Sequence, residues 1–368
     1  AKPVMWSPVE KTALAEAEVE YEDVTSTQID VAFLIESAPD ARELEGAYAV
    51  IWTTTPWTIP TNQAIAYGAE IAYQCVSFKV SRVEERTPDT WSTHEIDYPL
   101  NGRRFLVAKD LVAQFSSRLL NMVNQENPAG MAAPTRYSIE TTIVAEFSGS
   151  QLAGVIAQHP MHKLGGFFAK PRPFISAAHV TTDAGTGLVH MAPDHGEEDF
   201  LACKPHGIEP VFAVEADGVY RENWAWLPRD DPRSNSVINE KFNSKDGPIC
   251  SDLSEVGALL SVDTLKHSYP KSWRSKARII YRCTPQWFIP MDKVIDISTP
   301  EPVHMPEIPV GIGLTSLVAG HGKGNGPTLR EVALDAIERT RWVPERSKNR
   351  INAMVSDRPD WVISRQRA

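Results

Sequence analysis

One short segment of the chain, residues 183–200, is dense in side chains that can do chemistry. Its ionisable groups are His190, His195, Glu197, Glu198 and Asp199. Imidazole and carboxylate groups act as general acids and bases, hold cationic groups and coordinate metal ions. The residue types therefore predict a functional segment but leave its chemistry open.

Simpler interpretations compete for the same residues. Acids at a helix start, such as Glu197 and Glu198, usually serve as electrostatic caps, and a lone histidine after a strand is usually packed or hydrogen-bonded. A metal site is a third interpretation, in which the ligands would be His190, His195, Cys203 and His206. Their spacing matches no standard zinc signature, so we disfavour a metal site.

The segment has clear signals for the elements that must position it. Two glycines in residues 185–187 predict a tight turn, and the apolar pair at 188–189 predicts a short strand. Asp194 or His195 then suits the N-cap of a helix, and Gly207 suits its end. The first histidine would lie at a strand end and the last carboxylate at a helix start, where loops gather functional groups.

A second segment, residues 48–66, is an apolar strand-like run that breaks at Pro56 after Thr53, Thr54 and Thr55. Three adjacent hydroxyls in a strand would point to both faces, which a simple core strand does not need. Beside a turn they can bind sugar, phosphate or water. The competing interpretation is that threonine is simply a good strand former.

Taken together, the two segments resemble the editing domain of isoleucyl-tRNA synthetases. The run WTTTPWTIPTN at residues 52–62 is similar to that family's threonine-rich peptide, and residues 185–199 are similar to its second editing motif. Valyl and leucyl relatives carry an arginine after the paired threonines, where this chain has Thr55. Further similar stretches lie at residues 6–21, 273–276, 284–288 and 349–367.

The resemblance implies a set of site residues. Thr55 and Asp199 are expected to be catalytic, and the expected substrate-binding residues are Trp52, Thr53, Thr54, Trp57, Asn62 and His190. Asp199 would hold the ammonium of the amino acid, since an ionised carboxylate makes a strong charge-assisted bond to it. His190 would be a wall that excludes isoleucine. Glu198 stands where the family commonly has a second aspartate.

The function that the resemblance implies is proofreading, that is, hydrolysis of valine from misacylated Val-tRNA(Ile), and also of valyl-adenylate. The expected partners are the acceptor end of tRNA(Ile) and valine, with a terminal ribose hydroxyl helping to activate water. The family's two adenylate-forming signatures, His-x-Gly-His and Lys-Met-Ser-Lys-Ser, are absent. We therefore expect no cofactor and no metal here, with ATP and Mg²⁺ needed only by a full-length enzyme. A tRNA-positioning module and a metal-dependent hydrolase are the alternatives.

Composition bounds these expectations. The 368 residues are 42% hydrophobic with a net charge of −10, which supports a large core and argues against indiscriminate nucleic-acid binding. Four separated cysteines and no apolar run of spanning length predict a reduced, cytoplasmic monomer with no membrane contact. A mitochondrial location is also compatible with the sequence. The chain ends are expected to be boundaries inside a longer protein.

The expected fold is α+β, a β-barrel-like editing domain with flanking connective segments. Strands are predicted at 72–80, 103–107, 140–147 and 174–180, and helices at 109–120 and 328–339. The expected domains are a connecting arm at 1–45, an editing domain at 46–241, and a return segment at 242–368 with insertions near 224–240 and 298–327.

Several polar and aromatic stretches are expected at the surface. They are the segments 81–98 and 122–136, a loop with Lys170 and Arg172, and an exposed loop with Trp224 and Trp226. The basic residues between Lys271 and Arg282 suit either an RNA-binding surface or a surface crossed by ion pairs, and the sequence favours neither.

Overall fold

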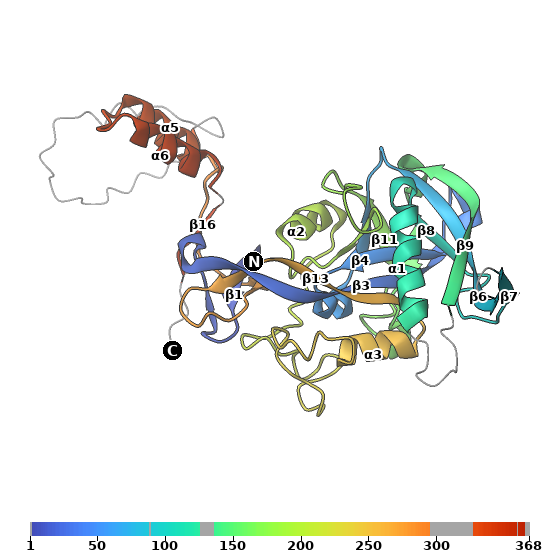
Figure 1. Ribbon diagram of the computed structural model, residues 1–368. Helices are drawn as coiled ribbons and strands as arrows, with labels where there is room; N and C mark the ends of the chain where they lie inside the picture. The colour runs from blue at the N-terminus through green and yellow to red at the C-terminus, as the bar shows by residue number, and fades with distance from the viewer. Residues whose placement is uncertain (1, 88–89, 126–135, 295–326, 359, 365–368) are drawn as a thin grey trace, which may run out of the picture. The chain divides into compact units, whose positions relative to one another are not determined.

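The computed structural model describes residues 2–87, 90–125, 136–294, 327–358 and 360–364, which form two units (Figure 1). The first unit runs as far as Pro285, and the second covers Gln286–Arg365. The predicted insertion at 298–327 and most of the predicted surface segment at 122–136 lie outside the described residues.

An eleven-stranded sheet forms the body of the first unit. Nine strands follow the order β12-β5-β11-β10-β3-β4-β8-β6-β7, while β13 pairs with β3 and β9 with β6. The strands are β3 (Val19–Ser37), β4 (Tyr48–Thr53), β5 (Ala64–Tyr67), β6 (Ala72–Thr87), β7 (Thr90–Glu95), β8 (Arg104–Ala108), β9 (Arg136–Ser148), β10 (Ile156–Gln158), β11 (Arg172–Ser176), β12 (Leu188–Met191) and β13 (Leu259–Ser272).

A long antiparallel ribbon runs out of this sheet. The first half of β3 pairs with β13 from Val19 to Val31, and the two strands are visible side by side in Figure 1. A separate three-stranded sheet consists of β14 (Ile280–Thr284), β1 (Lys2–Ser7) and β2 (Thr12–Ala13). Burial in β3 is concentrated between Ile29 and Ile35, where the strand also pairs with β4.

Three helices belong to the first unit: α1 (Val112–Gln125), α2 (Glu197–Cys203) and α3 (Pro248–Glu255). The short 3₁₀ turns are η1 (Glu16–Glu18), η2 (Arg42–Leu44), η3 (Pro56–Thr61), η4 (Lys109–Leu111), η5 (Gly149–Leu152), η6 (His162–Leu164) and η7 (Lys204–His206). Helix α1 buries one apolar stripe, in which the ring of Phe115 meets those of Phe78 and Phe105 at centroid distances of 5.7 and 6.1 Å.

The second unit is small. Its strands β15 (Phe288–Ile289) and β16 (Trp361–Val362) pair with each other, and its helices are α5 (Leu329–Arg339) and α6 (Arg346–Ser356). Thr328 caps α5, since its hydroxyl accepts the backbone N–H of Glu331 at 3.2 Å. The guanidinium of Arg330 grips both carboxylate oxygens of Asp292 at 2.6 and 2.7 Å.

The α+β class is confirmed, and so are the predicted strands and helices, with shifted ends. Strand β11 starts two residues before the predicted 174–180 and stops at Ser176, and helix α1 continues to Gln125 beyond the predicted end. The expected barrel closure is not among the described strand pairings, because no ladder joins β12 at one end of the sheet to β7 at the other. Strand β12 does pack against β4 across the sheet.

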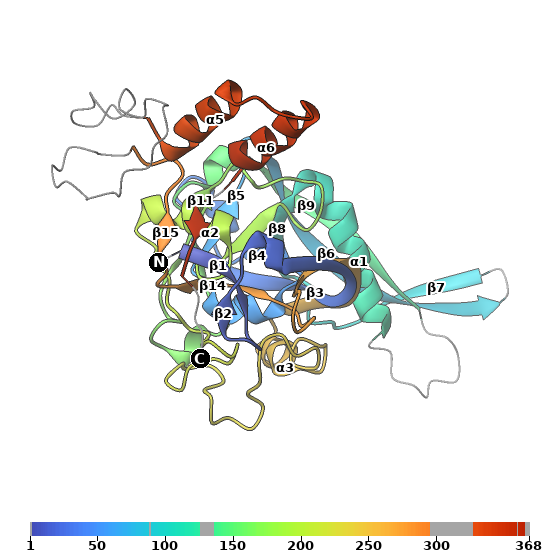
Figure 2. The ribbon, with the colours of Figure 1, turned by 90° about the vertical axis from the view of Figure 1, so that its left-hand side faces the viewer.

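Part of the predicted surface segment 81–98 is regular structure. The second half of β6 and β7 form a hairpin that projects from the unit (Figure 2). Among the described helices, none is long and apolar enough to cross a membrane.

Two surface predictions are wrong. Trp224 and Trp226 are each only 4% exposed, because they pack in an aromatic cluster with Phe167, Phe168, Tyr220 and Phe242. Arg172 is 1% exposed: its guanidinium donates to the carbonyls of Phe167 (3.0 Å) and Lys170, so it fastens its own loop from inside. Burial lowers the pKa of Arg172 to about 10.

The basic run after residue 270 is a surface crossed by ion pairs. Lys271 pairs with Glu22 at 2.6 Å and Lys276 with Glu20 at 2.5 Å, both across the β3–β13 ribbon. The two lysines are therefore neutralised by glutamates at the acidic start of β3.

The packing of α1 predicts the cost of truncating its central ring. Phe115→Ala should lower the free energy of unfolding by about 3–5 kcal/mol, because the fully buried ring leaves a cavity between α1 and the sheet. Gln114→Ala on the exposed face of the same helix should change it by less than about 0.5 kcal/mol. Denaturant unfolding measures both, and equal effects would contradict this account of the core.

Candidate functional site

The threonine-rich segment leaves the sheet where β4 ends. Thr53 is the last residue of β4, and η3 starts at Pro56. The hydroxyl of Thr53 accepts the backbone N–H of Thr55 at 3.0 Å and lies 3.0 Å from the Thr55 hydroxyl. The Thr58 hydroxyl donates to the Thr55 carbonyl at 2.8 Å. These hydroxyls therefore shape the turn that proline imposes.

Thr54 differs from its neighbours. It is half-buried, and its hydroxyl makes no hydrogen bond within the described part of the chain. Of the three threonines, it is the one whose hydroxyl is not used for holding the turn.

His190 joins the two sequence segments. It lies in β12, opposite Ile65 of β5, and its Nε2 is 3.0 Å from the Thr58 hydroxyl. Since Thr58 already donates its proton to the Thr55 carbonyl, it accepts from Nε2–H. The Nδ1 atom is then a bare acceptor, buried and without a partner. Burial, with a smaller effect of His195, lowers the pKa of His190 to about 4, so the imidazole is neutral.

Asn62 has a second unpartnered acceptor. Its side chain is fully buried, and its Nδ2 donates to the Ala64 carbonyl at 2.8 Å, which leaves Oδ1 without a hydrogen bond. The next residue, Gln63, donates its backbone N–H to the Met191 carbonyl at 2.8 Å, so Asn62 lies beside β12. Buried polar atoms rarely remain unpaired. Two unpaired acceptors next to the β5–β12 pair suit a ligand that donates hydrogen bonds.

Asp199 follows in the first turn of α2. The N-cap of this helix is Gly196, where Asp194 or His195 had been predicted, and no side chain caps it. The Asp199 carboxylate folds back over Gly196, where a Cβ atom would lie 2.6 Å from its Cγ, so a larger residue there would displace the carboxylate. Its Oδ2 accepts the backbone N–H of Ala192 at 2.8 Å.

Burial also makes Asp199 a weak acid. Its pKa is raised to about 7, first by burial and then by the charge of Glu198, while the bond from Ala192 opposes the rise. A half-buried carboxylate that titrates near neutrality is typical of a functional group rather than of a structural ion pair.

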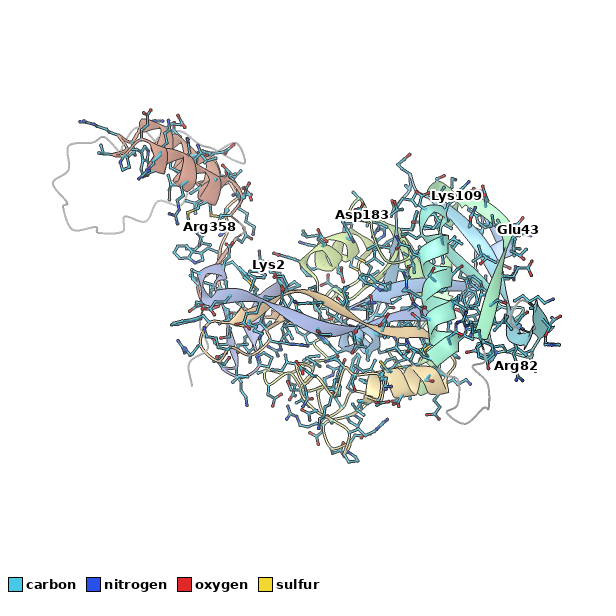
Figure 3. The ribbon with its side chains drawn as sticks, in the orientation of Figure 1. Lys2, Glu43, Arg82, Lys109, Asp183 and Arg358 are labelled. Atoms are coloured by element: carbon cyan, nitrogen blue, oxygen red, sulfur yellow. The ribbon has the colours of Figure 1, made fainter. Side chains whose placement is uncertain are left out.

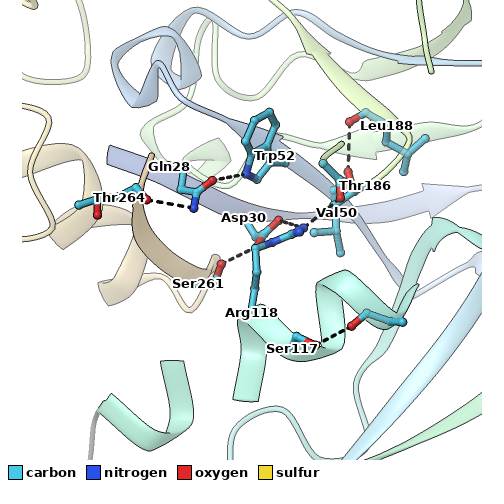
Figure 4. Close-up of polar contacts among 12 residues, drawn as sticks. Gln28, Asp30, Val50, Trp52, Ser117, Arg118, Thr186, Leu188, Ser261 and Thr264 are labelled. Carbon is cyan, nitrogen blue, oxygen red and sulfur yellow. Dashed lines mark hydrogen bonds and ion pairs between the residues drawn. The ribbon is translucent and has the colours of Figure 1, made fainter. Parts of the chain in front are cut away.

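The two tryptophans predicted to bind substrate have different surroundings. Trp57 is 5% exposed, its ring packs edge-on against His195 at 4.6 Å, and its carbonyl accepts the Tyr220 hydroxyl. Trp52 is half-buried in β4, and its Nε1 donates to the side chain of Gln28 at 3.2 Å (Figure 4). Trp57 is thus packed into the core beside the site.

The remaining polar residues of the segment have mixed surroundings, and among them His195 has a buried Nε2 without a hydrogen-bond partner. Asp194 is buried and accepts the backbone N–H groups of Val211 (2.9 Å) and Phe212 (2.6 Å). His195 binds the Tyr281 carbonyl through Nδ1 at 2.8 Å. Asp183, where the segment starts, is exposed at the surface (Figure 3). In the described ranges no three His, Cys, Asp or Glu side chains gather as a metal site.

The structure therefore brings most of the predicted residues together. Thr53, Thr55 and His190 are linked through Thr58, and Asn62 and Asp199 are anchored to the strand pair that carries His190. Sequence analysis missed Thr58, and it missed Asp30 and Arg118, which hold the turn at Gly185 (Figure 4). A lone aspartate inside the apolar run 29–35 was the available signal, because a buried carboxylate needs a partner.

Comparison with known proteins agrees with the motifs. The whole chain, residues 1–368, matches the family described as tRNA synthetases class I (I, L, M and V). It is 50% identical over 368 residues to the isoleucine–tRNA ligase of Zymomonas mobilis and 40% identical over 379 residues to that of Gluconobacter oxydans, in each case over 100% of this chain and 32% of the relative. The chain thus spans about a third of the length of these relatives.

Solved structures give a weaker match. The editing domain of the cytosolic leucyl-tRNA synthetase of P. knowlesi is 9% identical with a TM-score of 0.31, over 49% of this chain and 62% of that one. The match of the complete sequence to the family decides the assignment: the chain belongs to the class I tRNA synthetases (I, L, M and V), and its curated relatives here are isoleucine–tRNA ligases.

Proposed function

We propose that this chain is a proofreading module that hydrolyses the ester between valine and tRNA(Ile). The observation that carries the proposal is the 3.0 Å contact between Thr58 and His190, which makes one site of the threonine-rich segment and the β12–α2 segment. Had these segments lain apart, no single pocket could use both.

The reason for such a module is the limit of selection by size. A pocket that binds isoleucine cannot strongly reject valine, because one methylene is worth only about 1–3 kcal/mol, and isoleucyl-tRNA synthetase is the standard worked case of this limit. A second pocket, too small for isoleucine, solves the problem by destroying the valyl ester.

In this mechanism Asp199 holds the ammonium group of valine. The carboxylate must be ionised to do so, and a bound cation favours the ionised form. His190 forms a wall: it is 7% exposed and held by Thr58, so its ring has little freedom to yield to a longer side chain. Its neutral state also avoids repelling the ammonium.

Water attack needs positioning and stabilisation of the developing oxyanion. Thr54, whose hydroxyl is not used by the turn, and Asn62, whose Oδ1 is unpartnered, are the groups that we assign to the terminal adenosine and the ester. We assign the positioning of the water to Thr55. In this mechanism a ribose hydroxyl of the substrate helps to activate the water.

The domain arrangement stays part of the proposal. Residues 1–45 would connect to a synthetic core, 46–241 would edit, and 242–368 would return to the core. The arm includes β3, which runs up to Ser37 and is a central strand of the main sheet. The arm is therefore connected to the proposed editing site through the hydrogen bonds of one sheet.

Asp199→Asn should abolish hydrolysis of Val-tRNA(Ile) by the purified protein while the fold is kept, because the amide still accepts from Ala192 but has no charge for the ammonium. The matched control is Glu198→Gln, which removes one charge from the exposed neighbouring position and should hydrolyse normally above neutral pH. Deacylation of radiolabelled Val-tRNA measures both. A folded Asp199→Asn protein with normal deacylation would remove Asp199 from the site, and binding of tRNA without any hydrolysis by the unchanged protein would favour the positioning module.

Substitutions that change the size of the His190 side chain test its steric role. His190→Ala should begin to hydrolyse Ile-tRNA(Ile), at least about tenfold above the unchanged protein, because the wall is gone. His190→Phe keeps a ring in place and should still refuse isoleucine. Initial rates on Ile-tRNA and Val-tRNA give the comparison, and unchanged discrimination in the alanine variant refutes the steric role.

The pKa of Asp199 predicts two opposite pH effects. Hydrolysis of Val-tRNA, as kcat/KM, should fall as pH drops below about 7, because the protonated carboxyl cannot bind the ammonium. Stability should behave inversely: since the folded pKa lies above the usual 3.8, the contribution of Asp199 is present at low pH and is lost as pH rises through about 7. Asp199→Asn should therefore gain stability relative to the unchanged protein between about pH 5 and about pH 8. Denaturant midpoints at both values check the sign.

A further inference from the structure

Arg118 has no role in the site as described, yet it reaches the turn that starts the second segment. It lies on α1, and its Nη2 donates to the Gly185 carbonyl at 3.0 Å. The same guanidinium binds Asp30 through two bonds, Nε to Oδ2 at 2.6 Å and Nη2 to Oδ1 at 2.8 Å (Figure 4).

Asp30 is at the centre of the sheet. It is fully buried in β3, opposite Trp52 of β4 on one side and Ser261 of β13 on the other. The Ser261 hydroxyl donates to its Oδ2 at 2.5 Å. A buried carboxylate with three donors is fixed in place, and through Arg118 it fixes the position of the Gly185 carbonyl.

The turn at Gly185 lies directly against Trp52. Gly185 has φ +79°, and a Cβ atom there would come within 3.2 Å of the Trp52 ring. The next residue, Thr186, donates its hydroxyl to the Val50 carbonyl at 2.6 Å (Figure 4). Its own carbonyl accepts the backbone N–H of Ala108 at 2.8 Å. The turn is thus clamped to β4 just before the threonines.

These contacts connect both parts of the site. Residues 185–187 lead straight into β12, whose His190 binds Thr58, while Trp52 leads straight into Thr53. We infer that the Asp30–Arg118 pair is a positioning device for the proposed proofreading reaction: it sets the register between the His190 strand and the threonine-rich turn without touching substrate. The inference rests on the proposed function.

The first test variant is Arg118→Met, which keeps the aliphatic stem and removes the guanidinium. It should lower kcat for Val-tRNA hydrolysis by about 10- to 100-fold, since a displacement of about 1 Å at reacting groups has this effect. KM should change by less than about twofold, because the group makes no contact with substrate. The matched control is Arg330→Met, which removes a similarly shielded arginine (18% side-chain exposure, against 16% for Arg118) with a similar fork on a carboxylate, in the second unit. It should leave kcat unchanged.

A second variant separates positioning from stability. Arg118→Met alone leaves the buried charge of Asp30 unpaired and should be destabilised, whereas Asp30→Asn with Arg118→Met removes both charges and should regain most of that stability. If the pair positions the site, kcat stays low in the double variant. Activity that recovers together with stability would overturn the inference.

Millimolar guanidinium added to Arg118→Ala should restore part of kcat, and the same ionic strength of potassium chloride should not.

A readout without substrate keeps the two proposals distinct. Amide hydrogen exchange of residues 185–191 should be faster in the double variant than in the unchanged protein, with the α1 amides unaffected. Normal exchange at 185–191 would overturn the positioning role. If the unchanged protein does not deacylate Val-tRNA at all, the proposed function fails, and the exchange result still decides whether Arg118 holds this turn.

Discussion

The structure of the first unit depends on a carboxylate placed where strands are otherwise apolar. Ile29 and Val31 are fully buried, as expected for a strand covered on both sides, and Asp30 between them is equally buried. An unpaired charge at such a position is very costly, so the fold must supply donors. It does so from two different elements, Ser261 of β13 and Arg118 of α1. These bonds fix α1 and β13 relative to β3, and Arg118 also fixes the turn at Gly185 through its carbonyl.

The polar groups of the site fall into two sets with different tasks. The hydroxyls of Thr53, Thr55 and Thr58 are bonded to one another and to their own backbone, and they make the turn rigid. The unbonded atoms, Asn62 Oδ1 and His190 Nδ1, are buried acceptors. A rigid frame with a few unsatisfied acceptors is unfavourable for stability and favourable for binding a ligand that donates hydrogen bonds.

Local pattern predicted the elements of the site well, and it predicted tertiary partners poorly. Glycines, prolines and apolar alternation, which are signals within a few residues of sequence, predict strand β12, helix α2 after it and the start of η3. Arg172 was assigned to a solvated loop because charged residues among prolines usually lie in such loops. Its burial depends on carbonyls of Phe167 and Lys170 that only the folded loop presents. Trp224 was misjudged for the same reason, since its aromatic neighbours Phe167 and Phe168 come from a distant part of the chain. Trp226 packs instead against Tyr220 and Phe242 of its own stretch, an arrangement that the loop-like composition did not reveal.

The electrostatics of the site form a consistent whole. Burial lowers the pKa values of His190 and His195, so that these imidazoles are neutral at physiological pH. Neutral rings add no positive charge that would compete for Asp199. Burial raises the pKa of Asp199 to about 7, so that both forms of the carboxyl are populated near neutral pH. A cationic ligand would reverse that balance, because its charge stabilises the carboxylate where water cannot. Under the proposed function, this response to charge would favour an amino acid at Asp199, in addition to the exclusion by size proposed for His190.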